Sequence, residues 1–236
     1  MLDFDRFRVL TFDCYGTLIN WEAGILAAVR PMLTNRSIYV SDKDVLEAYA
    51  ELEVQLESGE YKSYRQVLRE CVAGLGLRFN FSPTASEMDA LPGSLPFWPP
   101  FGDTVAALRR LRSRFQLAII SNTDDDLFAA SARHLEIEFD HVVTAQQVKS
   151  YKPSHNNFLC AIEKMEIPRE QMLHVAQSIY HDIVPTRALG ISSVWVNRRK
   201  GLSGSGATLP AEGRPDLEVP DLKSLADLLL ETATIH

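Results

Sequence analysis

The sequence holds 236 residues, of which 46% are hydrophobic and 23% charged, as in globular proteins that bury a sizeable core. This length predicts one large domain, or a core with a smaller accessory unit. The formal charge of −7 supplies no attraction to nucleic acid or to an anionic membrane, so neither partner is expected. No apolar run reaches about 18 residues and residues 1–5 are acidic, which predicts no membrane span, no signal peptide and a cytoplasmic location.

The first predicted element is a fully buried strand at residues 9–12, because this run is apolar and β-branched without polar alternation. Asp13 follows it directly, and Gly16 permits a sharp turn just behind. In open α/β sheets the binding crevice lies outside the carboxyl ends of the strands, where Asp13 would present its carboxylate. A role for Asp13 as a turn or helix-capping residue fits this stretch equally well.

The cysteines Cys14, Cys71 and Cys160 are widely spaced and odd in number. This pattern favours reduced thiols over a disulfide framework or a zinc site. A nucleophilic Cys14 is disfavoured, because side chains alternate in direction at a strand end and Asp13 already takes the crevice side.

Residues 21–91 show helical periodicity and no convincing strand. Apolar residues recur at helical spacing in three runs, within 25–33, 45–56 and 64–71, and the pattern ends at Gly74 and Gly76. A small helical bundle inserted after the first strand is therefore predicted. Its exit is residues 91–100, a proline-rich linker in which helix and central strand are both disfavoured.

Beyond that linker, helical and strand patterns alternate. Helices are predicted at 103–114, 127–134, 158–165, 182–189 and 222–230, and strands at 117–120, 141–144, 172–176 and 193–196. Residues 201–206 are rich in glycine and serine and are expected to form a mobile loop. Strands separated by helices of this length imply βαβ units, hence an α/β fold with a doubly wound, mainly parallel, Rossmann-like sheet.

Several of the predicted strands end in polar residues that would meet at one edge of a parallel sheet. They are Asp13 and Thr17, Ser121 and Asn122, Lys152, and the run from Gln177 to Asp182. Taken singly, Ser121 is typical of a helix N-cap, Lys152 of a solvated lysine and Asp182 of a helix N-terminal carboxylate. Their joint order along the chain is hard to produce by chance and indicates a catalytic edge.

The segments 12–18, 121–122, 152–153 and the run ending in Asp182 resemble the four motifs of the haloacid dehalogenase superfamily. The resemblance covers a core at residues 1–19 and 99–236, and residues 20–98 stand where that superfamily places a helical cap domain. It implies an aspartate nucleophile, a covalent aspartyl intermediate and a cap that closes over the substrate.

The branch within that superfamily follows from charge. Phosphatase members of the superfamily show the pattern Asp-x-Asp in the first motif and Gly-Asp in the fourth. Here Tyr15 stands in place of the second aspartate of the first motif, and Gln177 stands in place of the acid of the fourth. Magnesium prefers hard anionic oxygens, so we expect no metal and no other cofactor. The pattern Asp-x-Tyr-Gly-Thr is instead similar to the L-2-haloacid dehalogenases, which attack carbon without a metal.

The same resemblance implies a division of labour. Asp13 would be the nucleophile, Lys152 the positive charge beside it, and Asp182 the group that positions or activates water. Ser121 completes the catalytic set. The residues expected to orient the nucleophile or bind substrate are Tyr15, Thr17, Asn122, Gln177, Ser178, Tyr180 and His181.

Three departures bear on the leaving group. No counterpart of the cap arginine that serves the halide is evident, which leaves Arg65 and Arg69 as alternatives, and Phe158 and Ile179 replace a tyrosine and an asparagine. The fourth motif resembles that of azetidine-2-carboxylate hydrolase, in which Tyr180 and His181 would serve a nitrogen leaving group.

The sequence thus predicts a metal-independent hydrolase that releases halide from a small (S)-2-haloacid. Carbon–nitrogen ring opening is the first alternative, a magnesium-dependent phosphatase the second and a catalytically silent binding module the third. A small carboxylate is the expected partner. The sequence does not decide the oligomeric state, for which a homodimer is one option.

Overall fold

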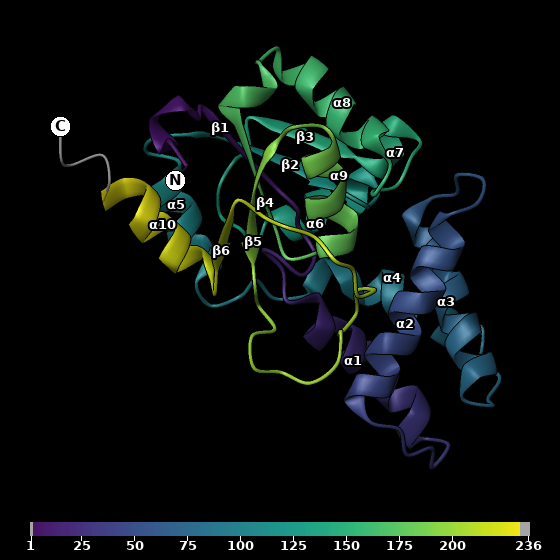
Figure 1. Cartoon of the computed structure of the whole chain (residues 1–236). Coiled ribbons are helices and arrows are strands. Elements are labelled where there is room, and N and C mark those ends of the chain that lie inside the picture. Colours follow the sequence, from purple (N-terminus) through teal and green to yellow (C-terminus); the bar gives the residue numbers. More distant parts are fainter. Residues whose placement is uncertain (1, 232–236) are drawn as a thin grey trace.

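The computed structural model describes residues 2–231 and shows a parallel sheet with helices on both faces (Figure 1). The strand order is β3-β2-β1-β4-β5-β6, and all five pairings are parallel. The strands are β1 Val9–Phe12, β2 Gln116–Ser121, β3 His141–Thr144, β4 Met172–Ala176, β5 Ser192–Val196 and β6 Leu217–Val219. The predicted doubly wound α/β fold is confirmed, and β1 lies where the strand order reverses, between β2 and β4.

Both faces of the sheet are covered, which explains why the strands read as continuous apolar runs. On one face, α5 (Thr104–Leu111) and α10 (Leu222–Glu231) pack against each other and against Leu10 and Phe12 of β1. On the other face, α8 (His155–Met165) packs against Val9 of β1 and lies beside α9 (Val184–Ala188). The remaining elements around the sheet are η1 Phe4–Arg6, α6 Asp125–Ala132, α7 Ala145–Val148, η4 Arg169–Gln171 and the π-helical turn η5 Ile179–Ile183.

The segment between β1 and α5 is helical and contains no strand in the described structure, as predicted. It holds α1 Trp21–Thr34, α2 Asp42–Glu57, α3 Tyr64–Arg78, η2 Glu87–Asp89, α4 Ala90–Ser94 and η3 Leu95–Phe97. These cap helices gather beyond the carboxyl ends of the strands, at the lower right of Figure 1. The division into domains at residues 20 and 98 remains a prediction. Among the described residues, no helix is long and apolar enough to cross a membrane.

Contacts from the loops after β2 and β5 help to hold the cap helices over the sheet. Asp124, after β2, accepts the backbone N–H groups of Tyr64 and Arg65 at 2.9 Å each, which satisfies the first turn of α3. The loop after β5 reaches α1 and α2, where Arg199 pairs with Glu22 and the Ser205 N–H donates to Glu47 at 3.0 Å. Residues 201–206 form neither helix nor strand, as predicted.

The expectation that Gly74 and Gly76 end the third cap helix is wrong, because α3 continues to Arg78. A Cβ at Gly74 would lie 2.6 Å from a Leu52 side-chain atom, and one at Gly76 would lie 2.7 Å from the Phe81 carbonyl oxygen. Close packing of α3 on its neighbours thus requires glycine here, at a helix-propensity cost of about 1 kcal/mol each.

The expectation that helix is disfavoured in residues 91–100 is also wrong for residues 91–97, which are helical in α4 and η3. The role of the segment as the linker back to the core remains a prediction. Pro92 and Pro96 both lie in the first turn of a short helix. Proline is tolerated there because the first N–H groups of a helix have no partner within it. Outside the cap, the unpredicted elements of the described residues include β6, which adds an edge strand, and α7, which is a single turn.

Candidate active site

Asp13 is positioned by the central strand. Its backbone N–H donates to the Val175 carbonyl at 3.1 Å and extends the pairing of β1 with β4 by one residue. Asp13 as a whole is 7% exposed. The Thr17 hydroxyl donates to one carboxylate oxygen at 2.7 Å, and the Lys152 ammonium donates to the other at 2.9 Å. Gly16, with φ +94°, makes the turn that brings Thr17 back to Asp13.

Lys152 is fully committed to this site. Its ammonium donates to Asp13, to Asp182 at 2.6 Å and to the Ile120 carbonyl at 2.9 Å, which uses all three of its N–H groups. Burial acts to lower the pKa of Lys152, but the two carboxylates outweigh burial and hold that pKa above its ordinary value. Lys152 is therefore a permanent buried cation.

Asp182 is held ionised on the opposite side of Lys152. Its Oδ1 also lies 2.9 Å from His174 Nε2, and His174 Nδ1 lies 2.9 Å from the Thr11 hydroxyl. Burial acts to raise the pKa of Asp182, but Lys152 and His174 overcome it and lower that pKa to about 2. Oδ2 of Asp182 is buried and has no partner among residues 2–231, so it is left to accept from a bound molecule or water.

Burial raises the pKa of the Asp13 carboxyl, with Lys152 and Thr17 opposing the rise. Burial also raises the pKa of the adjacent Cys14 thiol well above its ordinary value, which keeps it protonated and inert. The three cysteines are free, as predicted.

Ser121 and Asn122 separate into different tasks. The Asn122 amide oxygen accepts from the Lys152 backbone N–H at 2.7 Å, and its NH₂ donates to the Lys152 carbonyl at 3.0 Å and to Glu57 at 3.1 Å. Asn122 therefore positions Lys152. The Ser121 hydroxyl is buried and has no protein partner, so it is the group of this pair that remains able to bind a ligand.

The other predicted ligand-binding residues are spread over a wider area. Tyr15 lines the inner cavity with its ring while its hydroxyl lies 2.9 Å from the Ser131 hydroxyl, and Ser178 holds His181 through Oγ and Nδ1 at 3.1 Å. Gln177 faces a separate cavity beside α1, and Tyr180 faces the outer cavity. Burial lowers the pKa of His181 to about 4, so the ring is neutral near pH 7, and its Nε2 has no partner.

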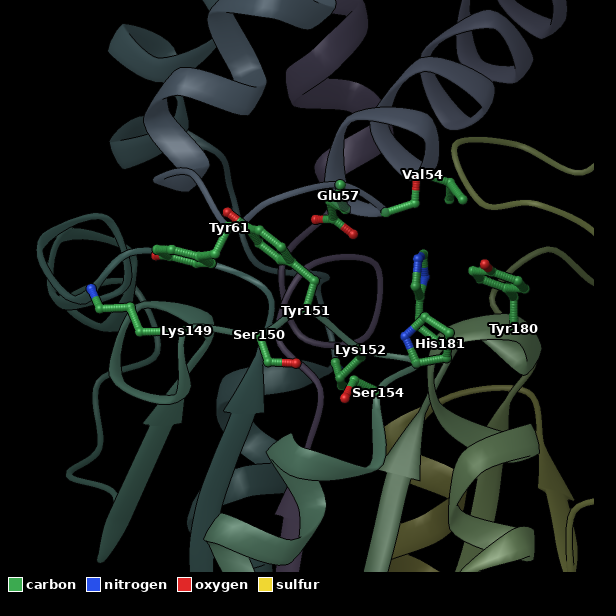
Figure 2. Close-up of a pocket in the computed structure, with 13 residues that line it drawn as sticks. Val54, Glu57, Tyr61, Lys149, Ser150, Tyr151, Lys152, Ser154, Tyr180 and His181 are labelled. Carbon is green, nitrogen blue, oxygen red and sulfur yellow. The ribbon is translucent and has the colours of Figure 1, made fainter.

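Two cavities meet at this site. The inner chamber, about 30 Å³, lies over Asp13 and is lined on the cap side by four side chains, Trp21, Glu53, Glu57 and Tyr64. The outer cavity, about 370 Å³, shares Glu57, Lys152 and His181 with it (Figure 2). A volume of about 30 Å³ holds little more than one or two waters, so the cap side chains must move before a substrate reaches Asp13.

The cap side of the chamber is acidic, which the sequence analysis missed. Glu53, 3% exposed, accepts from the hydroxyls of Tyr49 at 2.8 Å and Tyr64 at 2.7 Å. Glu57 accepts from Asn122, while its Oε1 is buried without a partner. Burial raises the pKa of Glu53 to about 7 and that of Glu57 well above its ordinary value. The periodic signal was present, because Tyr49, Glu53 and Glu57 recur every four residues on α2.

Arg65 and Arg69 do not serve this site. Arg65 pairs with Asp126 at 2.6 Å and Arg69 with Asp89 at 3.4 Å, and both side chains are nearly half exposed. Within residues 2–231, no arginine lines either of the two cavities described above. His174, in contrast, belongs to the site and was missed, although a histidine inside the apolar run of β4 was a visible signal.

The donor set at Asp13 does not fit a magnesium ion. Asp182 and Asp13 already share the Lys152 ammonium, the Tyr15 hydroxyl turns toward Ser131, and Gln177 faces elsewhere. Among the described residues, no group of three or more histidine, cysteine or acidic side chains is placed to hold a metal ion.

Comparisons with known proteins agree with one another. The sequence pattern of the haloacid dehalogenase-like hydrolases matches residues 7–190. An (S)-2-haloacid dehalogenase, H-109, of Pseudomonas putida is 28% identical over 94% of this chain and 97% of its own length. Haloacetate dehalogenase H-2 of a Moraxella species is 29% identical over 95% and 98%.

Solved structures share the fold. An L-2-haloacid dehalogenase from Xanthobacter autotrophicus with chloropropionic acid covalently bound has a TM-score of 0.77 at 19% identity, covering 98% of this chain and 100% of its own. A magnesium-bound hydrolase, YfnB, from Bacillus subtilis has a TM-score of 0.73 at 19% identity, covering 95% and 99%. Because the fold is common to both, the chemistry must be argued from the site.

Proposed function

The chain belongs to the haloacid dehalogenase-like hydrolases, and from that membership we propose that it is a metal-independent hydrolase acting on a small 2-substituted carboxylic acid. The first candidate substrate is an (S)-2-haloacid, the class named in its relatives. The observation that carries the proposal is the buried Asp13 carboxylate, held by Lys152 and Thr17 at the floor of the inner chamber.

Asp13 is suited to attack carbon. Each of its oxygens accepts one hydrogen bond and retains a further lone pair. An oxygen of Asp13 forms the bond to the α-carbon, the carbon–halogen bond breaks, and halide leaves with the electron pair. The α-carbon is inverted and an ester joins it to Asp13.

The substrate carboxylate is expected beside Lys152, whose positive charge is fixed and dehydrated. The unpartnered Ser121 hydroxyl donates to it. Asn122 acts through Lys152 as a positioning residue.

Hydrolysis of the ester requires a water that loses a proton. The free Oδ2 of Asp182 lines the chamber and is the available carboxylate oxygen, while its Oδ1 remains bound to Lys152 and His174. Water attacks the ester carbonyl carbon of Asp13 and gives a proton to Asp182. The bond from that carbon to the ester oxygen then breaks, the departing alkoxide takes a proton, and a 2-hydroxy acid leaves while the Asp13 carboxylate is restored.

The three alternative functions are ranked as in the sequence analysis. Opening of a strained carbon–nitrogen ring at the α-carbon is the second candidate, favoured by the acidic cap side of the chamber. The phosphatase alternative is weakened by the misfit of the magnesium donor set, and the silent module by three ionised groups buried in one network. Cytoplasmic location, absence of a nucleic-acid partner and a homodimer remain predictions.

The test compares three activities of the full chain: halide release from (S)-2-chloropropionate, opening of azetidine-2-carboxylate, and magnesium-dependent phosphate release. We expect one of the first two, unchanged by excess chelator and lost in Asp13→Asn. Phosphate release that is abolished by chelation and restored by magnesium would overturn the proposal.

A further inference from the structure

We infer that Glu53 and Glu57 form a recognition site for a basic nitrogen on the substrate, in the chamber that Asp13 also lines. The inference rests on the proposed function and narrows its substrate class to 2-substituted carboxylates that carry an amine. The chemistry is that of an alkylammonium, whose N–H groups are matched by carboxylate oxygens.

The first step is placement. Tyr49, Glu53 and Glu57 share one face of α2, and the two carboxyls line the chamber over Asp13. In the described residues neither carboxyl has an ion-pair partner within 4.0 Å, whereas Asp13 and Asp182 share Lys152. Burial disfavours the ionised form of an unpaired carboxyl and raises the pKa of both groups, so the pair lacks a cation that would compensate their charge.

A structural role explains part of this cluster but not all of it. Glu53 is satisfied by two tyrosine hydroxyls, as a packing residue would be. Around the same chamber, however, Glu57 Oε1, Ser121 Oγ and His181 Nε2 are buried and have no partner. His181 is 7% exposed and Ser121 1%. Unpaired polar atoms that converge on one chamber indicate a polar ligand there.

The charges of the two sides then define the ligand. The floor offers the unpartnered Ser121 hydroxyl to a carboxylate, near the positive charge of Lys152, and the cap side offers the acidic oxygens of Glu53 and Glu57. A departing halide is an anion and gains nothing from Glu53 and Glu57 once they ionise. A neutral His181 does not oppose a cation. A zwitterion with its carboxylate on the floor and its ammonium toward the cap matches both sides (Figure 2 shows Glu57 and His181 at the border of the outer cavity).

Binding of a matched ligand pair tests this without relying on turnover. Titration calorimetry compares 4-amino-2-hydroxybutyrate with 2-hydroxybutyrate, which has the same chain length and lacks the ammonium. The wild-type chain should bind the amino ligand at least tenfold more tightly. Glu57→Gln and Glu53→Gln should each reduce that preference, and the double variant should abolish it.

The variants are chosen to fold. Glutamine retains an acceptor for the tyrosine hydroxyls and for Asn122, and thermal melting verifies each protein. Glu51→Gln is the matched control, because Glu51 lies on the same helix but is exposed and pairs with Arg78; it should leave the preference unchanged. If Glu53→Gln does not fold, Glu57→Gln carries the test.

Equal affinity for the two ligands in wild type, or a preference that survives in the double variant, would overturn the inference. Either result is distinct from failure of the proposed function, which would be seen as no turnover of any 2-substituted acid. Turnover of azetidine-2-carboxylate, weakened in Glu57→Gln, would show that the recognised nitrogen is the leaving group; turnover of 2-chloro-4-aminobutyrate with the same sensitivity would show that the nitrogen is retained.

Discussion

The floor and the cap side of the chamber both bury carboxyl groups, yet they treat them in opposite ways. Asp182 and Glu53 are 0% and 3% exposed. The pKa of Asp182 is lowered to about 2, and that of Glu53 is raised to about 7. Burial acts to raise both pKa values, so the difference between them comes from the charged and polar groups around each carboxyl.

On the floor, Lys152 lies 2.6 Å from Asp182 and 2.9 Å from Asp13, and the ion network is complete without a ligand. On the cap side, Glu53 has tyrosine hydroxyls and Glu57 has one amide, with no cation. The contrast teaches that compensation, more than depth, decides whether a buried carboxyl is charged. The floor holds its charge ready for catalysis, while the cap side is left for the substrate to complete.

The largest effect is expected from breaking the floor. Lys152→Ala leaves Asp13 and Asp182 as neighbouring carboxyls without their cation, so turnover should fall by about 10³-fold or more, and stability should fall as well. Turnover assays with denaturant unfolding measure both. Lys223→Ala, an exposed lysine on α10, is the control and should change neither. Turnover of Lys152→Ala within tenfold of wild type would contradict the role of the floor.

Asp182→Asn should separate the two halves of the reaction. The amide cannot accept a proton from water, so ester formation should outpace ester hydrolysis and turnover should fall by about 10²-fold or more. Intact-mass spectrometry should then show an adduct of the substrate acyl chain on the protein, absent from Asp182→Asn combined with Asp13→Asn. An unmodified protein with normal turnover would remove Asp182 from the mechanism.

The raised pKa of Glu53 should make the free energy of unfolding depend on pH. Its pKa is about 7 in the folded protein against an ordinary 4.5, so below pH 4.5 it is protonated in both states and costs nothing. As the pH rises from 4.5 to about 7 the unfolded state ionises while the folded state stays protonated, so the native state loses up to about 3 kcal/mol, and the loss is complete above the folded pKa. Denaturant unfolding should therefore show Glu53→Gln gaining stability relative to wild type between pH 5 and pH 8. A difference that does not change with pH would contradict the raised pKa.

The smallest expected effect is in the acid limb of the pH–rate profile. Asp13 must be ionised to attack, and burial raises its pKa despite Lys152. The value of kcat/KM should consequently fall with decreasing pH at a higher pH than an ordinary aspartate would give, about 4. Asp182 does not contribute to this limb, because its pKa is held at about 2. A profile that stays flat below pH 4 would contradict the shift.

The floor could be predicted from the sequence because topology gathers it. Asp13, Ser121 and the run leading to Asp182 each follow a strand, and parallel strands bring their carboxyl ends to one edge whatever the details of packing. The roles were less predictable, since Asn122 is occupied by Lys152 and Gln177 turns to another cavity. Those orientations depend on a few backbone torsions beyond each strand.

The cap side could not be predicted in the same way. Glutamates on an amphipathic helix are usually assigned to the solvated face. The helical periodicity of α2 places Glu53 and Glu57 on the buried face only when Tyr49, four residues before Glu53, is taken into account. The predicted helix boundaries were also wrong at the helical glycines and at the first-turn prolines. At the glycines, close tertiary contacts with Leu52 and Phe81 outweigh the low helix propensity of glycine. The helix boundaries and the burial of the cap glutamates therefore depend on long-range packing, which the local sequence pattern does not show.

In the proposed mechanism, Asp13 donates one of its carboxylate oxygens to the hydroxyl group of the product. With enzyme in excess over substrate, a single turnover in heavy-oxygen water should give a product hydroxyl that carries the ordinary oxygen of Asp13. The heavy oxygen should appear in the Asp13 carboxylate, located by mass spectrometry of the peptide that contains it. Heavy oxygen in the product of that first turnover would identify water as the nucleophile and contradict the account.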